Sequence, residues 1–474
     1  MQLCHTVSAT SAVFDDPNLV SCAGLVPVLG LAAPCWGWRP RAGVGGPVLG
    51  LAARCGLGTS AGTALTVPSP NAAAKLTTLV AGMVAGADSI DDMDLLRHGG
   101  MGRVFDEVRA PSTLGSFLRS FRFGHVRQLD QVAAGLLVKL VAHAPLLRDV
   151  DQMVLVDVDD TMKATYGYAK QGAGYGCSGV KGLNALIGTV STVTSAPVIA
   201  ATRLRKGSTH SARGAARLIA DTLATTRRCR SDRATGLVLT RADSAFYNAD
   251  VVAAISRGGS RFPITARMDK AVQAAIATID DTTWTPIRYP NAVFDDTEQR
   301  WISDADVAET PYTAFTSRGA GRAVTGRLIV RRVRRLNPAG SADQGELLPA
   351  YRYHAVFTNS DLIMLQAEAC HRGHAIVEQV IADLKAGPLT HLPSGSFTAN
   401  AAWLVCAAIT HNLTRAAGCL ASMFHAKATT ATIRTQLVNI PARLARSARQ
   451  LRLHLPTHWR WEHAWQALLT ATTT

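Results

Sequence analysis

The stretch Val154-Leu-Val-Asp-Val-Asp-Asp-Thr161 decides the fold. Its branched apolar residues predict a central strand that is covered on both faces. Carboxylates interrupt this strand, although burial penalises their charged form. Because successive side chains of a strand point to opposite faces, Asp157 and Asp160 do not share one environment. We expect Asp159, at the end of the strand, to bind a cation; the alternative is a strand that ends in a solvated turn.

The size and charge of the chain limit the class of protein. A chain of 474 residues predicts two to four domains. The 47% hydrophobic and 18% charged residues are typical of a globular protein. A net charge of +15 and a pI near 9.8 indicate a polyanionic partner. We find no apolar run of about 18 residues for a membrane segment, and the first residues lack the basic start of a signal peptide. We therefore expect a cytoplasmic protein that binds no membrane.

The nine cysteines form no CxxC pair, so the sequence supports neither a zinc knuckle nor a redox motif. We expect most of them to be small buried hydrophobes in a reducing compartment.

The chain before the central strand divides into two parts. Residues 1–68 are poorly defined, and Pro27–Cys35 recurs as a near-copy at Pro47–Cys55, where we expect irregular structure. Residues 69–150 show helical spacing, including an amphipathic helix over Asp130–His143. This α-helical part is a candidate DNA-binding domain. A plain helical bundle with a basic face is the alternative.

The rest of the chain predicts an α/β core that an insertion interrupts. In residues 151–283, three strands, a helix, a strand and further helix and strand segments describe an α/β sheet. Residues 284–360 contain short apolar runs broken by Gly, Pro and Asp, which predicts a β-rich insertion. Helices return in 361–425, over Leu362–Lys385 and Phe397–Met423, and the basic segment 426–474 is expected to be helical over Pro441–His454.

Acids recur at the ends of predicted elements. Asp243 ends its strand as Asp159 does. In the predicted helix 362–385, successive side chains are rotated by about 100° around the helix axis. Four polar side chains then point in directions within about 60° of one another. They are His371, His374, Glu378 and Lys385, and the opposite side carries Ile376, Val377, Val380, Ile381 and Leu384. This pattern predicts a helix that packs with one face and presents an acid with the other.

Three segments together resemble the DDE transposases of bacterial insertion sequences. They are Asp157–Thr161, Arg241–Tyr247 and the helix pattern His371-x2-His374-x3-Glu378-x6-Lys385. The closer resemblance is to the subgroup with a β insertion between the second Asp and the Glu. The helix motif of that subgroup is Tyr-x2-Arg-x3-Glu-x6-Lys, so the two histidines replace its Tyr and Arg. The resemblance covers roughly residues 70 to 470 and implies a ribonuclease-H-like catalytic core.

The resemblance implies that Asp159, Asp243 and Glu378 are catalytic and hold Mg²⁺ or Mn²⁺, with two ions expected. Oxygen ligands suit these hard cations. Two ions about 4 Å apart would activate a water or a 3′-OH and stabilise the leaving oxygen. Lys385 would hold a phosphate of the DNA, beside His371 and His374. Zinc binding by the two histidines is a weaker alternative.

Basic and aromatic residues elsewhere are candidate DNA contacts. The first group, Arg331, Arg332 and Arg334, lies on a predicted strand of the insertion. The second group, Arg443, Arg446 and Arg449, recurs along one side of the predicted C-terminal helix. With this net charge, phosphate contact is favoured over a solvated face. Trp284 and Trp301, in the insertion, are expected either to stack on a flipped base or to pack in the core.

The sequence thus predicts a transposase that binds the ends of its insertion element and catalyses DNA cleavage and strand transfer. Its partners would be the terminal inverted repeats, the target DNA and a second copy of itself in a synaptic complex at the nucleoid. One alternative is a structure-specific nuclease on the same core. The other is an inactive or domesticated DNA-binding protein.

Overall fold

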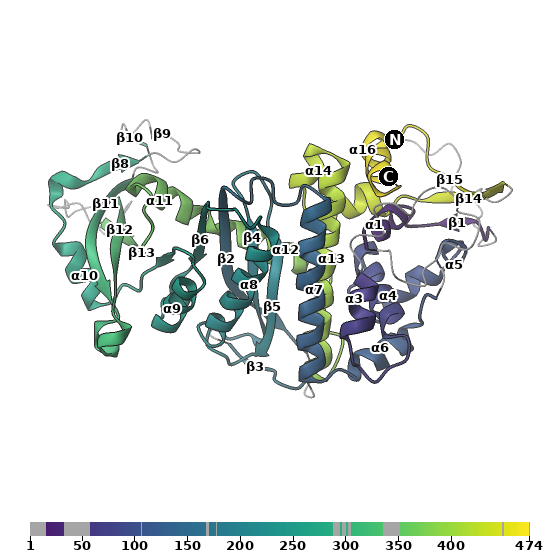
Figure 1. The fold of residues 1–474 in the computed structure, drawn as a ribbon, viewed down its shortest axis with the longest axis horizontal. Coiled ribbons are helices and arrows are strands. Elements are labelled where there is room, and N and C mark those ends of the chain that lie inside the picture. The colour runs from purple at the N-terminus through teal and green to yellow at the C-terminus, as the bar shows by residue number, and fades with distance from the viewer. Residues whose placement is uncertain are drawn as a thin grey trace.

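The computed structural model describes residues 16–32, 57–105, 107–166, 170–176, 178–287, 294–295, 300–301, 305–334, 351–447 and 450–473 (Figure 1). It is a mixed α/β structure built around one long sheet. Among these residues, no helix is long and apolar enough to cross a membrane.

The predicted central strand is β2 (Met153–Ala164), which lies inside the sheet. In spatial order, this part of the sheet contains β5 (Val198–Lys206), β4 (Lys181–Ser191), β2, β6 (Leu237–Ala242) and β7 (Pro263–Thr265). β5, β4 and β2 are antiparallel neighbours, whereas β6 and β7 continue parallel to β2. The short β3 (Gly174–Tyr175) also pairs with β4. β2 continues to Ala164, paired with β4, so the expectation that the strand ends at Asp159 is wrong. Its parallel pairing with β6 stops at Val158 and Ala242, one residue before Asp159 and Asp243.

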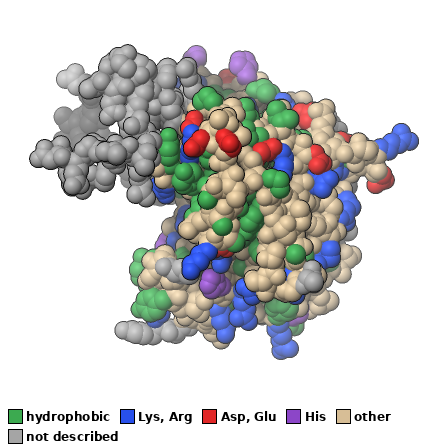
Figure 2. All heavy atoms as spheres, turned by 90° about the vertical axis from the view of Figure 1, so that its left-hand side faces the viewer, with side chains coloured by type: hydrophobic (Ala, Val, Ile, Leu, Met, Phe, Trp, Pro, Cys, Tyr) green, Lys and Arg blue, Asp and Glu red, His purple; other side chains and the backbone are tan. Residues whose placement is uncertain are grey.

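The strands predicted between residues 284 and 360 continue this sheet. After β7 follow β13 (Tyr351–Thr358), β12 (Val324–Arg334), β11 (Ala305–Ala314) and β8 (Thr285–Ile287), all antiparallel. β9 (Phe294–Asp295) and β10 (Arg300–Trp301) form a separate pair. Figure 2 faces this end of the molecule and shows Lys and Arg side chains interspersed with acidic and hydrophobic ones.

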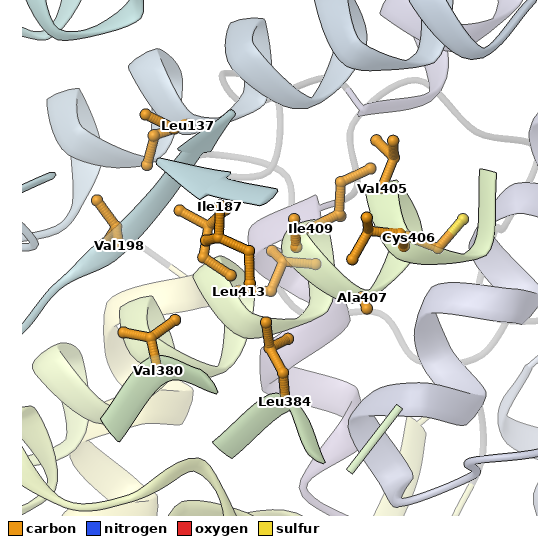
Figure 3. Packing of buried hydrophobic residues seen from close by; sticks show 14 of the residues in the cluster. Leu137, Ile187, Val198, Val380, Leu384, Val405, Cys406, Ala407, Ile409 and Leu413 are labelled. Atoms are coloured by element: carbon orange, nitrogen blue, oxygen red, sulfur yellow. The ribbon is translucent and has the colours of Figure 1, made fainter. Parts of the chain in front are cut away.

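Helices cover both faces of the sheet. α8 (Ala215–Cys229) packs on β5, β4 and β2, and α9 (Ala249–Arg257) packs against α8. α7 (Phe123–His143) and α13 (Phe397–Ala421) run side by side next to β5 (Figure 1). Most residues of α13 are buried, and they include polar side chains such as Asn400 and Asn412 besides the apolar ones. Figure 3 shows its side chains Ile409 and Leu413 beside Ile187 of β4.

The helical N-terminal part packs directly on α13. Its helices are α4 (Ala72–Ala85), η2 (Asp91–Arg97), α5 (Met101–Val104) and α6 (Pro111–Arg119). α4 and α6 contact α13, and one continuous cluster of buried apolar residues joins this part to the sheet. The irregular structure expected for the duplicated stretch is wrong for residues 27–32, which belong to α1 (Leu25–Ala32). The rest of the first copy and the whole second copy lie outside the described residues. After the repeat, α3 (Leu57–Ala64) is also helical.

The C-terminal segment differs from its prediction. Residues 441–454 form a hairpin of β14 (Ala442–Ser447) and β15 (Gln450–His454), to which β1 (Leu19–Val20) adds a third strand. The predicted helix is therefore wrong here. Ala442 and Leu444 are buried while Arg443 between them is exposed, so the side chains alternate with the period of a strand. The flanking segments are helical: α14 (Met423–Lys427), α15 (Thr430–Ile433), the π-helical turn η8 (Arg434–Val438) and α16 (Glu462–Thr473).

The predicted helix 362–385 is interrupted. It consists of α11 (Met364–Arg372), the 3₁₀ turn η7 (Gly373–Ala375) and α12 (Ile376–Lys385). The interruption coincides with Gly373, a residue of low helix propensity. A β-carbon at this position would come within 3.0 Å of the Arg241 guanidinium. The apolar side of α12 is buried as predicted, through Val377, Val380, Ile381 and Leu384. Remaining elements are α10 (Lys270–Ala277) and the 3₁₀ turns η3 (Ser244–Phe246), η4 (Asp281–Thr283), η5 (Thr316–Arg318) and η6 (Ala320–Arg322).

Candidate active site

The three acids of β2 have different surroundings. Asp157 is fully buried and accepts two hydrogen bonds of 2.7 Å from Nε and Nη2 of Arg241. His374 donates a third, from Nδ1, at 2.9 Å. Asp157 is therefore an internal ion-pair partner, held by the neighbouring strand β6 and by the turn before α12.

Asp160 points to the other face of the sheet. Its carboxylate pairs with Arg205 and accepts a hydrogen bond of 2.9 Å from the side-chain amide of Asn184. Arg205 also donates to the backbone carbonyls of Ser211 and Arg213, each at 2.7 Å. Asp160 thus helps to order the loop that leads into α8.

Asp159 has no such cation beside it. In the described structure its carboxylate accepts the backbone N–H of Asp160 at 2.7 Å and forms no salt bridge. Asp243 accepts the backbone N–H of Ala245 at 2.9 Å and likewise forms no salt bridge with a described residue. In the parallel pair of β2 and β6, Asp157 lies opposite Arg241. Two residues further on, Asp159 within β2 and Asp243 directly after β6 therefore lie on the same face of the sheet, just past the point where these two strands stop pairing.

The charge of Asp243 acts on Asp159. The pKa of Asp159 is raised to about 6, chiefly by burial and in part by the negative charge of Asp243. Burial also raises the pKa of Asp243. His374 acts in the opposite direction on both pKa values. Acids that have lost part of their hydration and form no salt bridge favour either a proton or a metal ion.

Glu378 lies on the first turn of α12 and is exposed. It follows His374 by four residues, which is about one helical turn. Within the described ranges, no group of three or more His, Cys, Asp or Glu side chains is arranged to hold a metal ion. The structure thus brings Asp159 and Asp243 together, and Glu378 lies on the adjacent helix without completing a three-residue cluster.

The two predicted DNA-contacting histidines are engaged inside the fold. Nε2 of His371 lies 2.9 Å from Oγ1 of Thr265 in β7. The His371 ring stacks on His374 with ring centroids 6.3 Å apart and planes 9° apart. Burial lowers the pKa of His371 to about 3, so its ring is neutral. Lys385, in contrast, is exposed at the end of α12, and its charge together with burial lowers the pKa of Lys163.

The other predicted DNA contacts vary in their surroundings. Arg331 pairs with Glu368 at 3.2 Å. Arg332 pairs with Asp306 at 2.9 Å, and its guanidinium lies 4.2 Å from the ring centroid of Trp284. Arg443 is 69% exposed and lies 3.6 Å from Asp16. The side chains of Arg334, Arg446 and Trp301, and the whole of Arg449, lie outside the described part of the chain.

Sequence reasoning missed Arg241 and Arg205. The spacing gave one signal for Arg241, since Arg241-x-Asp243 on β6 matches Asp157-x-Asp159 on β2. In a parallel pair with this register, a buried Arg and a buried Asp lie opposite each other. Arg205 had no comparable signal, because its partner Asp160 lies two strands away across β4.

Comparison with known proteins agrees with this arrangement. No curated protein matches the chain. The model of the family described as transposase DDE domain group 1 matches residues 71–473. The match includes β2, β6 and α12, and so all three candidate carboxylates. The predicted family is thereby confirmed, and the chain belongs to the DDE transposases.

Proposed function

We propose that this protein is a transposase that binds the ends of its own insertion element and catalyses metal-dependent DNA cleavage and strand transfer. The supporting observation is the pair formed by Asp159, half-buried within β2, and Asp243, exposed directly after β6. Both lie on one face of the sheet, and neither forms a salt bridge with a described residue. The arginine pairs of Asp157 and Asp160 support Asp159 as the metal ligand of β2, because their carboxylates already have a cationic partner.

The chemistry of these residues fits a divalent metal. Carboxylate oxygens are the ligands that Mg²⁺ and Mn²⁺ prefer. The raised pKa values of Asp159 and Asp243 indicate that positive charge at this place would be stabilising. Glu378 is exposed on the adjacent helix, so rotation of its long side chain is the simplest way for it to join them. When bound, such ions supply a polarised nucleophile and neutralise charge on the leaving oxygen.

We assign the sheet β5–β4–β2–β6–β7 as a ribonuclease-H-like core. The support is its order, in which an antiparallel β2–β4–β5 unit is followed by two helix-linked strands parallel to β2. β8, β11, β12 and β13 would then be the insertion between Asp243 and Glu378. In this assignment, both strand acids and the acid of α12 converge on one edge.

DNA is the proposed substrate and partner. The net charge of +15 favours a polyanion. Lys385 is exposed seven residues after Glu378 on the same helix and would hold a phosphate beside the cleavage site. Two copies would act together on the two ends of the element, on chromosomal DNA in the cytoplasm. The dimer rests on analogy with the family.

The test is a cleavage assay on DNA that carries the flanks of the gene, with Mg²⁺ or Mn²⁺. Three proteins are compared: wild type, Asp243→Asn and the control Asp232→Asn, which alters an exposed acid. We expect wild type and the control to cut at discrete ends, and Asp243→Asn to bind the DNA without cutting it. If all three bind equally and none cuts, the protein is an inactive DNA-binding protein. Cutting that depends on DNA structure, without joining, would favour a nuclease.

A further inference from the structure

The segment before Glu378 is tied to both strands that carry the candidate ligands. Arg241 of β6 makes two hydrogen bonds of 2.7 Å to Asp157 of β2, and its Nη1 donates to the carbonyl of Cys370 in α11 at 2.7 Å. His374 of η7 donates from Nδ1 to the same Asp157 at 2.9 Å. We call Asp157, Arg241 and His374 the clamp. It joins two strands and the turn that begins α12 through charge-assisted hydrogen bonds.

The clamp is protected from water. The side chains of Asp157 and Arg241 are 0% and 3% exposed, and that of His374 is 14% exposed. His371 stacks on His374 and bonds to Thr265 of β7. Hydrogen bonds in such surroundings are strong, because little water competes for the groups. The clamp therefore fixes the orientation of the His374 ring.

Each member of the clamp precedes a candidate ligand by two to four residues along the chain. Asp157 lies two residues before Asp159 on one face of β2, and Arg241 lies two residues before Asp243. His374 precedes Glu378 by four residues, about one helical turn. The clamp residues are thus more buried than the candidate ligands, and each clamp residue precedes one candidate ligand in the chain.

The far side of α12 has a different kind of attachment. Its side chains Val380 and Leu384 are buried and point toward α13 (Figure 3). Apolar packing of this kind is not directional, so it sets the depth of the helix more than its rotation. The directional contacts at this end include the hydrogen bonds to Asp157 and to the Cys370 carbonyl, and the contact of His371 with Thr265. Rotation of the first turn of α12 decides where Glu378 points.

We propose that His374 is a positioning residue: by its hydrogen bond to Asp157 it holds the first turn of α12 so that Glu378 can reach the metal site formed with Asp159 and Asp243. The part of this inference that concerns metal binding rests on the proposed function. The part that concerns the orientation of α12 by His374 does not depend on it. His374 acts through Asp157 and Glu378 and makes no contact with substrate.

The test uses two substitutions in the full-length protein. His374→Asn keeps a nitrogen donor at the place of Nδ1, whereas His374→Ala removes it. His391→Ala is the matched control, because His391 also bonds an acid through Nδ1, at 2.9 Å, but is exposed. The readouts are amide hydrogen exchange of residues 376–385, Mn²⁺ binding measured directly, and DNA nicking.

In His374→Ala we expect faster exchange in α12 with unchanged exchange in α8, and Mn²⁺ affinity weaker by about 10–100-fold, the usual effect of losing a residue that orients a ligand. His374→Asn should recover most of both properties, and His391→Ala should match wild type. DNA binding should be equal in all four proteins.

Three results separate the possibilities. Unchanged exchange and unchanged Mn²⁺ affinity in His374→Ala would overturn the proposal. A His374→Asn protein as impaired as His374→Ala would also overturn it, because the imidazole itself would then be required. Faster exchange in His374→Ala, with a wild type that neither binds Mn²⁺ nor cuts, would support the hold on α12 and refute the proposed function instead.

Discussion

Replacing Arg241 by Met should destabilise the protein strongly. The substitution leaves Asp157 fully buried, with His374 as its remaining side-chain partner. Removing one member of a buried ion pair costs about 3–5 kcal/mol, because the other charge stays in a medium that solvates it poorly. The Cys370 carbonyl would lose its donor as well. We expect a loss of unfolding free energy in this range, measured by urea unfolding of wild type and variant.

The double substitution Asp157→Leu/Arg241→Met is the informative control. It removes both charges, and replacing a whole buried pair with apolar residues is often close to neutral. The double variant should therefore be more stable than Arg241→Met alone. A loss below about 1 kcal/mol for Arg241→Met would refute the reasoning. So would a double variant whose loss equals the sum of the two single losses, since residues in contact should couple.

Three further predictions follow from the geometry. Asp159→Asn should stabilise the metal-free protein at pH 7 by at most about 3 kcal/mol. The pKa of Asp159 is raised to about 6, chiefly by burial, so wild type loses stability relative to the variant as the pH rises from about 4 to about 6 and keeps this deficit at higher pH. The two proteins should therefore converge in urea unfolding near pH 4. Gly373→Ala should lower the melting temperature, because the β-carbon of the new alanine would lie 3.0 Å from the Arg241 guanidinium. An unchanged melting temperature would argue against this contact. Leu444→Ala should lower the free energy of unfolding by about 2–5 kcal/mol, because Leu444 is only 6% exposed in the hairpin. Arg443→Ala should lower it by less than about 0.5 kcal/mol. Equal losses in urea unfolding would favour a helix there.

Much of the sheet could be predicted from the sequence because its strands carry strong local signals. The apolar run before Asp157 predicts β2, and the run before Asp243 predicts β6. The C-terminal hairpin was missed because arginines at every third position suggest a helix face. The alternation of Ala442, Arg443 and Leu444 was the better guide, because burial of apolar side chains outweighs the spacing of exposed charges.

The site was predictable only in part. Among the three acids of β2 the sequence favoured Asp159 only because it was expected to end the strand, and β2 in fact continues to Ala164. The surroundings that distinguish the acids could not be predicted, because they depend on which arginine lies across the sheet. In the structure Arg241 pairs with Asp157 and Arg205 with Asp160. His371 and His374 were expected to contact DNA, because their predicted directions assumed that 362–385 is one regular helix. The turn η7 and the stacking of His371 on His374 direct them inward instead.

The central claim is that Asp159 and Asp243, and neither Asp157 nor Asp160, hold the metal. The most direct measurement is a calorimetric titration of the DNA-free protein with Mn²⁺. It compares four proteins: wild type, Asp159→Asn, Asp243→Asn and Asp160→Asn. We predict that the first two variants lose binding, while Asp160→Asn, whose carboxylate faces the other side of the sheet, retains the wild-type affinity within about threefold. Binding that survives in Asp159→Asn and disappears in Asp160→Asn would contradict the account.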